Sequence, residues 1–238
     1  GYIRSPIEVA YENDLKVLAF DEGQMERAVM AWFADEESSR LAIGQELWRR
    51  ISSQANVRYV LRCPLLLRLA CQAADEAWQN NRTLPRWERR VELYETFLKN
   101  AVAQWAERAE PRPSREQRGL FLSFAADVAG QLWQKDARRT LWDEHVVAQA
   151  VNDARERYHA LNNRPDLFGD LCTAGLLVPA GPDTPDTPLM FTHRSFGEYL
   201  TACALAQKAN TKGWETIADF VDKKAWLPEW QEVIVFLS

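Results

Sequence analysis

The segment that most constrains the fold is a candidate β-hairpin with helices on both sides. Two short apolar runs, LLVPA at 176–180 and PLMFT at 188–192, flank a turn rich in proline and glycine. This pattern is typical of two paired strands. Two helices are expected before the hairpin, at 143–161 and 167–174, and another directly after it. The order helix, helix, hairpin, helix predicts a winged-helix module in a mainly α chain.

The helix after the hairpin is carried by residues 191–206, FTHRSFGEYLTACALA. Its apolar residues recur at the spacing of one buried helix face: Phe196, Tyr199, Leu200, Cys203 and Ala206. Ser195 is expected to cap the first turn, with Thr192 as the second candidate. His193, one of three histidines, lies beside helix amides that favour an anion. Its position fits a phosphate contact, and it also fits a structural cap or a hydrogen-bonded packing residue.

The chain before this module is expected to be a series of helices. Two helices are expected at 21–33 and 37–51, and a turn is expected at 57–64. Helix starts are expected where a capping residue or a helix-start proline precedes an apolar stripe: Asp21, Pro64, Ser114 and Asp166. LKVLAF at 15–20 predicts a short strand near the N-terminus. The predicted fold class is therefore a helical bundle followed by a winged-helix domain with one small β-hairpin.

Composition narrows the function classes. Of the 238 residues 47% are hydrophobic, so the chain can bury a core, and the net charge of −5 argues against a general nucleic-acid-backbone binder. The four cysteines form no CxxC pair, and no histidine lies at ligand spacing, so no metal site is predicted. No signal peptide or transmembrane run is present, so we expect a cytoplasmic protein without a membrane partner.

A DNA-binding winged helix is one alternative function. Between residues 143 and 174 there are six acidic residues and three arginines. A helix that reads a DNA groove needs polar side chains toward base edges and cations toward phosphates. This acidic balance makes nucleic acid an unexpected partner.

Three stretches carry a resemblance to a known family. These are CPLLLRLAC at 63–71, LPRWERRVELYETFL at 84–98, and GLLVP followed by MFTHRSFGEYLTA at 175–202. Together they resemble the C-terminal part of a NACHT-type STAND nucleoside triphosphatase, a class that includes bacterial defence proteins and animal innate-immune receptors. The resemblance covers nearly the whole chain.

The resemblance implies a division into four parts. Residues 1–20 correspond to the tail of the α/β nucleotide-binding core and 21–84 to helical domain 1. Residues 85–209 correspond to the winged-helix domain, and 210–238 to the start of a downstream helical region. Since the chain begins with glycine and stops within an apolar run, we expect it to be part of a longer protein.

The resemblance also implies two nucleotide contacts. The family's proline that packs against adenine corresponds to Pro64, and its histidine that contacts the β-phosphate of ADP corresponds to His193. Cys63 stands where the family often has asparagine. A rigid apolar ring suits a flat base, and an imidazole can donate to a phosphate oxygen.

No complete ATPase active site is present in this sequence. The phosphate-binding G-x-x-x-x-G-K-[ST] loop is absent, and no apolar run ends in paired acids for magnesium. We expect an upstream P-loop domain to supply these parts and to hold ADP or ATP with Mg²⁺. The expected function is a regulatory switch in innate-immunity or antiphage defence signalling, with a downstream sensor or repeat region and homo-oligomerisation on activation. The main alternative is a nucleotide-independent helical adaptor.

Overall fold

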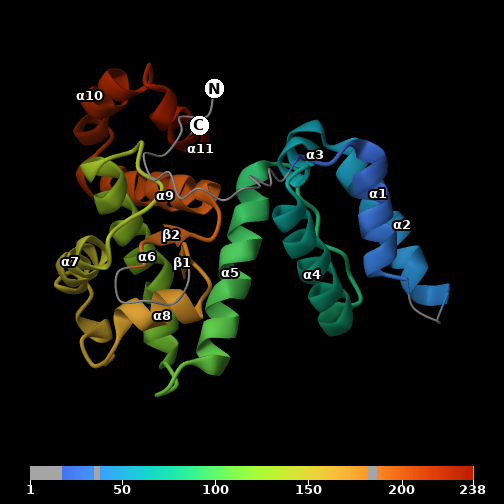
Figure 1. The fold of residues 1–238 in the computed structure, drawn as a ribbon, viewed down its shortest axis with the longest axis horizontal. Helices are drawn as coiled ribbons and strands as arrows, with labels where there is room; N and C mark the ends of the chain where they lie inside the picture. The colour runs from blue at the N-terminus through green and yellow to red at the C-terminus, as the bar shows by residue number, and fades with distance from the viewer. Residues whose placement is uncertain (1–17, 35–37, 182–186, 238) are drawn as a thin grey trace. The chain divides into compact units, whose positions relative to one another are not determined.

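The computed structural model describes residues 18–34, 38–181 and 187–237, and it is mainly helical with one two-stranded hairpin (Figure 1). The expected fold class is thereby confirmed. The chain divides into two compact units, Gly1–Glu88 and Arg89–Ser238. Residues 15–17 of the strand expected at 15–20 lie outside the described residues, and residues 18–20 are not in a strand. The assignment of the four parts to domains of a STAND protein stays a prediction.

The described residues of the first unit form four helices: α1 (Glu22–Trp32), α2 (Ser38–Ser53), α3 (Ala55–Leu61) and α4 (Pro64–Asn81). The helix start expected at Asp21 is confirmed, because Asp21 and Gln24 form a reciprocal capping box. The Gln24 N–H donates to Asp21 Oδ1 at 2.7 Å, and the Asp21 N–H donates to Gln24 Oε1 at 2.8 Å. Helix α1 packs against both α2 and α4.

The turn expected at 57–64 is wrong, since α3 occupies most of that range. Val57 and Leu61, four residues apart, are both buried on one face of α3. Seven residues hold too few turns for a visible helical period, so the core contact of this face decides the structure.

The second unit contains α5 (Arg90–Arg108), α6 (Arg115–Lys135), α7 (Glu144–Arg155), the 3₁₀ turn η1 (His159–Leu161), α8 (Leu167–Thr173), β1 (Leu177–Pro179), β2 (Leu189–Phe191), α9 (Arg194–Lys212), α10 (Glu215–Lys224), the 3₁₀ turn η2 (Pro228–Trp230) and α11 (Gln231–Leu237). Helices α6 and α9 make the most extensive contact in this unit. Ser114 and Gln117 form the expected capping box at the start of α6.

The helix expected over 143–161 is shorter than predicted. Helix α7 ends at Arg155, and η1 follows as a separate turn. The Arg155 Nη2 donates to the backbone carbonyl of Arg164 at 3.0 Å, which ties the following loop back to the helix end. Because Arg155 in the last turn of α7 binds the returning loop, it favours a helix end at this residue.

The hairpin is antiparallel, with Leu177 opposite Phe191, Val178 opposite Met190 and Pro179 opposite Leu189. Trp142 extends it on the other edge of β2, because the backbone groups of Trp142 and Leu189 exchange two hydrogen bonds of 2.8 Å. Before the hairpin, Asp166 caps α8 through the Gly169 N–H at 2.7 Å, as expected. Gly175 then turns the chain with φ of 69°, a conformation that favours glycine.

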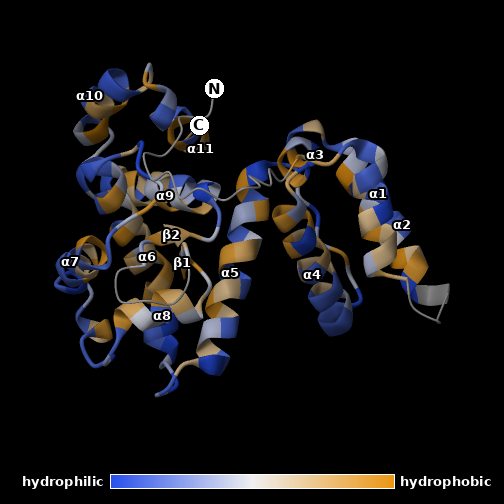
Figure 2. Cartoon of the chain, in the orientation of Figure 1, coloured by the Kyte–Doolittle hydropathy of each residue, from blue (hydrophilic) through white to orange (hydrophobic). Residues whose placement is uncertain are grey.

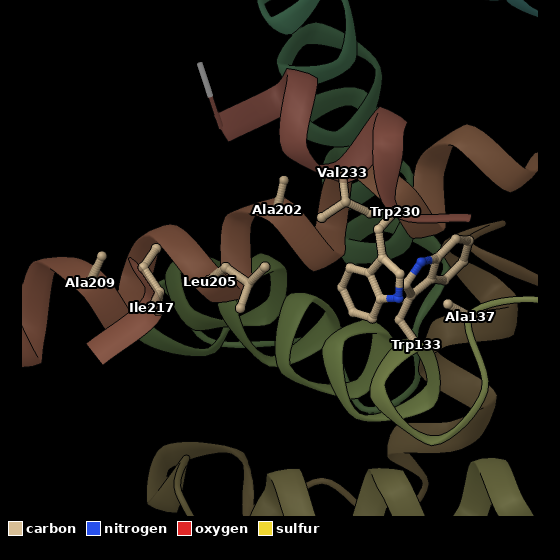
Figure 3. Close-up of a cluster of buried hydrophobic side chains, with 8 residues drawn as sticks. All are labelled: Trp133, Ala137, Ala202, Leu205, Ala209, Ile217, Trp230 and Val233. Atoms are coloured by element: carbon tan, nitrogen blue, oxygen red, sulfur yellow. The ribbon is translucent and has the colours of Figure 1, made fainter. Parts of the chain in front are cut away.

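The C-terminal helices pack onto α6 and α9 through one apolar cluster (Figure 3). Its buried members are Trp133, Ala137, Ala202, Leu205, Ala209, Ile217, Trp230 and Val233. The Trp133 indole N–H donates to the Glu229 carbonyl at 3.3 Å, so the buried ring keeps a hydrogen bond. Hydrophobic and hydrophilic residues alternate around the helices of this unit (Figure 2), as expected for amphipathic helices around a core.

Candidate site around His193

His193 is the N-cap residue of α9. Its backbone is extended, with φ of −143° and ψ of 138°, and its Nδ1 accepts the Ser195 N–H at 3.2 Å. The expectation that Ser195 or Thr192 would cap this helix is therefore wrong. Ser195 lies inside the first turn, and the Thr192 hydroxyl instead donates to the Gly175 carbonyl. An imidazole at the cap position presents an acceptor to the same amide that an asparagine side chain would reach.

The two contacts of Nδ1 fix which ring nitrogen carries the proton. The Ser195 N–H is a donor only, so Nδ1 must accept, and the Ser195 hydroxyl lies 2.5 Å from the same nitrogen. The neutral ring then carries its proton on Nε2. His193 therefore presents Nε2–H as a hydrogen-bond donor at the start of a helix.

Tyr94 on α5 packs near this cap. Its ring centroid lies 5.8 Å from that of Phe196, which lies 6.4 Å from the His193 ring centroid. The Tyr94 side chain is only 2% exposed. Burial raises the pKa of Tyr94 to about 12, so its hydroxyl stays protonated and able to donate at neutral pH. The cap of α9 thus lies against buried aromatic side chains of α5 and α9.

A pocket of about 280 Å³ opens beside His193. Its lining combines aromatic side chains, two arginines and the backbone around the hairpin: Trp133, Arg139, Thr140, Trp142, Met190, Phe191, Thr192, His193 and Arg194. The Arg139 guanidinium lies 5.8 Å from the Trp142 ring, and that of Arg194 lies 5.1 Å from the Trp133 ring. Such cation–π contacts hold the two arginines against the pocket wall.

Both arginines also have carboxylate partners. Arg139 pairs with Asp143 at 3.0 Å, and Arg194 pairs with Glu198 at 2.9 Å. Burial raises the pKa of Glu198, while the bond from Arg194 opposes that rise. Asp143 and Glu198 therefore partly compensate the positive charge at the pocket. The site would bind an anion mainly through N–H donors.

Pro64 lies in the first unit, as the first residue of α4, where its missing N–H costs no helical hydrogen bond. The residue is half-buried. Pro64 and His193 thus belong to different units, each placed by its own helix start. The geometry of Pro64 matches a helix-start proline, and its partly exposed ring fits contact with a flat base.

Cys63 precedes Pro64 in an extended conformation and occupies the N-cap position of α4, but its side chain makes no capping hydrogen bond. We expect Cys63→Asn to raise the free energy of unfolding by about 1 kcal/mol, because asparagine supplies the missing acceptor. Urea unfolding of the variant against wild type measures this, with Cys63→Ala as the control that adds no acceptor. An unchanged or lower stability of Cys63→Asn would contradict the role of this cap.

The second unit also contains a buried ion pair that the sequence did not predict. Asp170 on α8 accepts Arg164 Nε at 2.8 Å and Nη2 at 2.6 Å, and the Trp105 indole N–H donates to it at 2.9 Å. Arg164 is 2% exposed and Asp170 is 5% exposed. Their charges compensate each other inside the core, so neither bears on DNA recognition. The other five acids and two arginines of residues 143–174 keep the acidic balance.

A second cavity, of about 310 Å³, lies in the first unit. Three arginines line it, and each has a carboxylate partner. Arg49 and Arg50 both bind Glu46, and Arg86 pairs with Glu88. Together the two arginines lower the pKa of Glu46 to about 2. Since each arginine of this cavity is paired with a carboxylate, we assign no ligand-binding site to the cavity.

Within the described ranges, no group of three histidine, cysteine or carboxylate side chains is placed to hold a metal ion. The four cysteines form no disulfide, and burial raises the pKa of Cys71 to about 12, so its thiol is not an activated nucleophile. His145 and His159 are exposed. Of the helices that the structure describes, none has the length and apolar character needed to cross a bilayer.

No protein-family model matches the chain, and no curated protein matches it. The resemblance to NACHT-type proteins therefore rests on the residues of the three stretches.

Proposed function

We propose that this chain is the regulatory half of a NACHT-type signal-transduction ATPase that closes over bound ADP and controls nucleotide-dependent oligomerisation. One observation carries the proposal: the histidine of the FTHRSF stretch caps α9 by accepting the Ser195 N–H with Nδ1, so the neutral ring carries its N–H donor on Nε2. A helix start with such a donor suits the oxygen of a phosphate. The wall of the neighbouring pocket adds two arginines.

In this proposal an upstream P-loop domain of a longer cytoplasmic protein binds the nucleotide and Mg²⁺ and supplies the phosphate-transfer chemistry. His193 donates to the β-phosphate of ADP, and the Pro64 ring packs against the adenine. The chain's own residues orient and hold the diphosphate; they transfer no group. A downstream sensor region and a second copy of the protein are the partners in signalling, in defence against infection.

The expected difference in free energy between the closed and open states is large enough for a switch. One hydrogen bond to a charged group contributes about 1.5–3 kcal/mol. If this bond forms with ADP and is absent with ATP, the ratio of closed to open protein changes by roughly ten- to a hundredfold. A bond of this strength can hold a marginal equilibrium in its resting state.

The test is ADP retention by the full-length parent protein carrying His193→Ala. We expect ADP affinity to fall about ten- to a hundredfold and the resting state to oligomerise more readily. His193→Asn is the matched variant, because asparagine restores the α9 cap but not the longer reach of Nε2–H. It should recover stability without recovering ADP retention. His159→Ala, at an exposed histidine, serves as the control.

Two results would overturn the proposal. One is unchanged ADP retention and oligomerisation in His193→Ala, which would leave His193 as a structural cap and favour the adaptor function. The other is full ADP retention in His193→Asn, which would show that the cap alone is required.

A further inference from the structure

The two arginines of the pocket beside His193 differ in how firmly they are held. Arg194 donates from Nε to the Glu198 carboxylate at 2.9 Å and from Nη2 to the Ala137 carbonyl at 3.2 Å. The Arg194 guanidinium also lies over the Trp133 ring. Because Glu198 is buried and needs its counter-charge, Arg194 is committed to this arrangement.

Arg139 is held more weakly. It lies in the loop between α6 and α7, and its Nη2 donates to Oδ2 of Asp143 at 3.0 Å. Both side chains of this pair are half-exposed. An ion pair that is open to solvent contributes little stability. Arg139 can therefore exchange Asp143 for a stronger partner at small cost.

Asp143 has alternative partners of its own. It is the N-cap residue of α7, with φ of −62° and ψ of 142°, but its side chain makes no capping hydrogen bond to the α7 amides, all of which the structure describes. A carboxylate at this position can accept the backbone N–H of the second or third helical residue, here His145 or Val146. Release of Arg139 thus allows Asp143 to cap α7, and the bond gained offsets the ion pair lost.

The pocket that Arg139 and His193 share suits a small anionic group. Its volume of about 280 Å³ is near the lower end for ligand pockets, about 300–1,000 Å³. Of the described residues that line it, none is acidic, and four are apolar: Trp133, Trp142, Met190 and Phe191. Apolar walls keep water away, so a guanidinium binds a phosphate more strongly here than on an open surface.

We propose that this pocket binds a phosphate group, that Arg139 supplies its counter-charge, and that Asp143 releases Arg139 by turning to cap α7. The neutral His193 ring contributes an N–H donor, and the guanidinium adds the charge that a neutral imidazole lacks. The assignment of this phosphate to ADP rests on the function proposed above; the anion site itself does not. In the nucleotide complex, Arg139 is then a second phosphate contact beside His193.

The anion site is tested by titrating the 238-residue chain with pyrophosphate and following its backbone amides by nitrogen-15 NMR. We expect shifts of the Arg139 and Thr140 amides at the pocket, and of the His145 amide where Asp143 forms the new cap. Gly119, at the far end of α6, is the internal reference. The same spectra report whether each variant keeps its fold. Unchanged Arg139 and Thr140 amides at millimolar pyrophosphate would overturn the proposal.

Arg139→Gln and Arg138→Gln form a matched pair of variants. Each removes one positive charge, but Arg138 pairs with Glu229 at 3.1 Å and does not line the pocket. We expect Arg139→Gln to weaken pyrophosphate binding about ten- to a hundredfold, the range for a hydrogen bond to a charged group. Arg138→Gln should change it less than about twofold. Equal losses would mean that general charge attraction holds the anion, and would overturn the site.

Asp143→Asn tests the release of Arg139 through an effect of opposite sign. Asparagine still caps a helix but does not hold a guanidinium by charge. We expect pyrophosphate binding to strengthen about two- to fivefold. Glu144→Gln removes the neighbouring exposed negative charge and should change binding less than about twofold. Weaker or unchanged binding in Asp143→Asn would overturn the release step.

The nucleotide arm keeps the two proposals apart. In the full-length parent, Arg139→Gln is expected to weaken ADP retention about ten- to a hundredfold, as His193→Ala does. Loss in His193→Ala with no loss in Arg139→Gln would overturn Arg139 as an ADP contact and leave the proposed function standing. No loss in His193→Ala would overturn the function, and the pyrophosphate titration would still decide the anion site.

Discussion

Asp170→Ala is expected to lower the free energy of unfolding of the second unit by about 3–5 kcal/mol, because it leaves the guanidinium of Arg164 buried without a counter-charge. The same change removes the acceptor of the Trp105 indole N–H, whose ring stacks on Phe121 at 3.9 Å. Urea unfolding measures the loss. Hydrogen exchange of the α8 amides identifies the transition that belongs to this unit, since a chain with two compact units need not unfold in one step.

The matched control is Glu156→Ala, an exposed carboxylate after α7, which is expected to change stability by less than about 0.5 kcal/mol. A double-mutant cycle with Arg164→Ala completes the test. Since either single variant strands one buried charge, the double variant should cost less than the sum of the singles. Additive costs, or a loss for Asp170→Ala no larger than for Glu156→Ala, would contradict a strongly coupled buried pair.

The features that the sequence predicted well are those set by neighbouring residues. The capping boxes at Asp21 and Ser114 and the cap at Asp166 follow from side chains three residues from their partner amides. The hairpin follows from its turn composition. Helix α3 was missed because its seven residues depend on the core contact of Val57 and Leu61 rather than on a visible period.

The surroundings of the candidate site could not be predicted in the same way. The position of His193 at a helix start was found from local pattern, but its role as the cap was assigned to Ser195, since serine is the commoner capping residue. Tyr94, Trp133 and Trp142 reach the site from distant parts of the chain through tertiary packing alone. The buried pair of Arg164 and Asp170 looked like surface charge, because charged residues are seldom fully buried.

Gly197→Ala is expected to destabilise the second unit by about 1–3 kcal/mol, although alanine is the better helix former. A Cβ at this buried position of α9 would lie 2.7 Å from Cδ2 of Phe191 and 3.0 Å from Cζ3 of Trp133. Both rings are themselves buried, so the strain passes to the hairpin and α6. The helix-propensity gain of about 1 kcal/mol does not offset an overlap of this size.

Gly119→Ala is the matched control, because Gly119 is an exposed position of α6 where an added Cβ meets nothing within 4 Å. There the same substitution should stabilise the chain by about 0.5–1 kcal/mol. Thermal and urea unfolding of the two variants compare the signs directly. Phe191 and Trp133 also line the pocket beside His193. In nitrogen-15 NMR spectra, Gly197→Ala should therefore shift the signals of the His193 ring, whereas Gly119→Ala should not. Stabilisation by both variants would mean that the contact of α9 with the hairpin is looser than the structure has it.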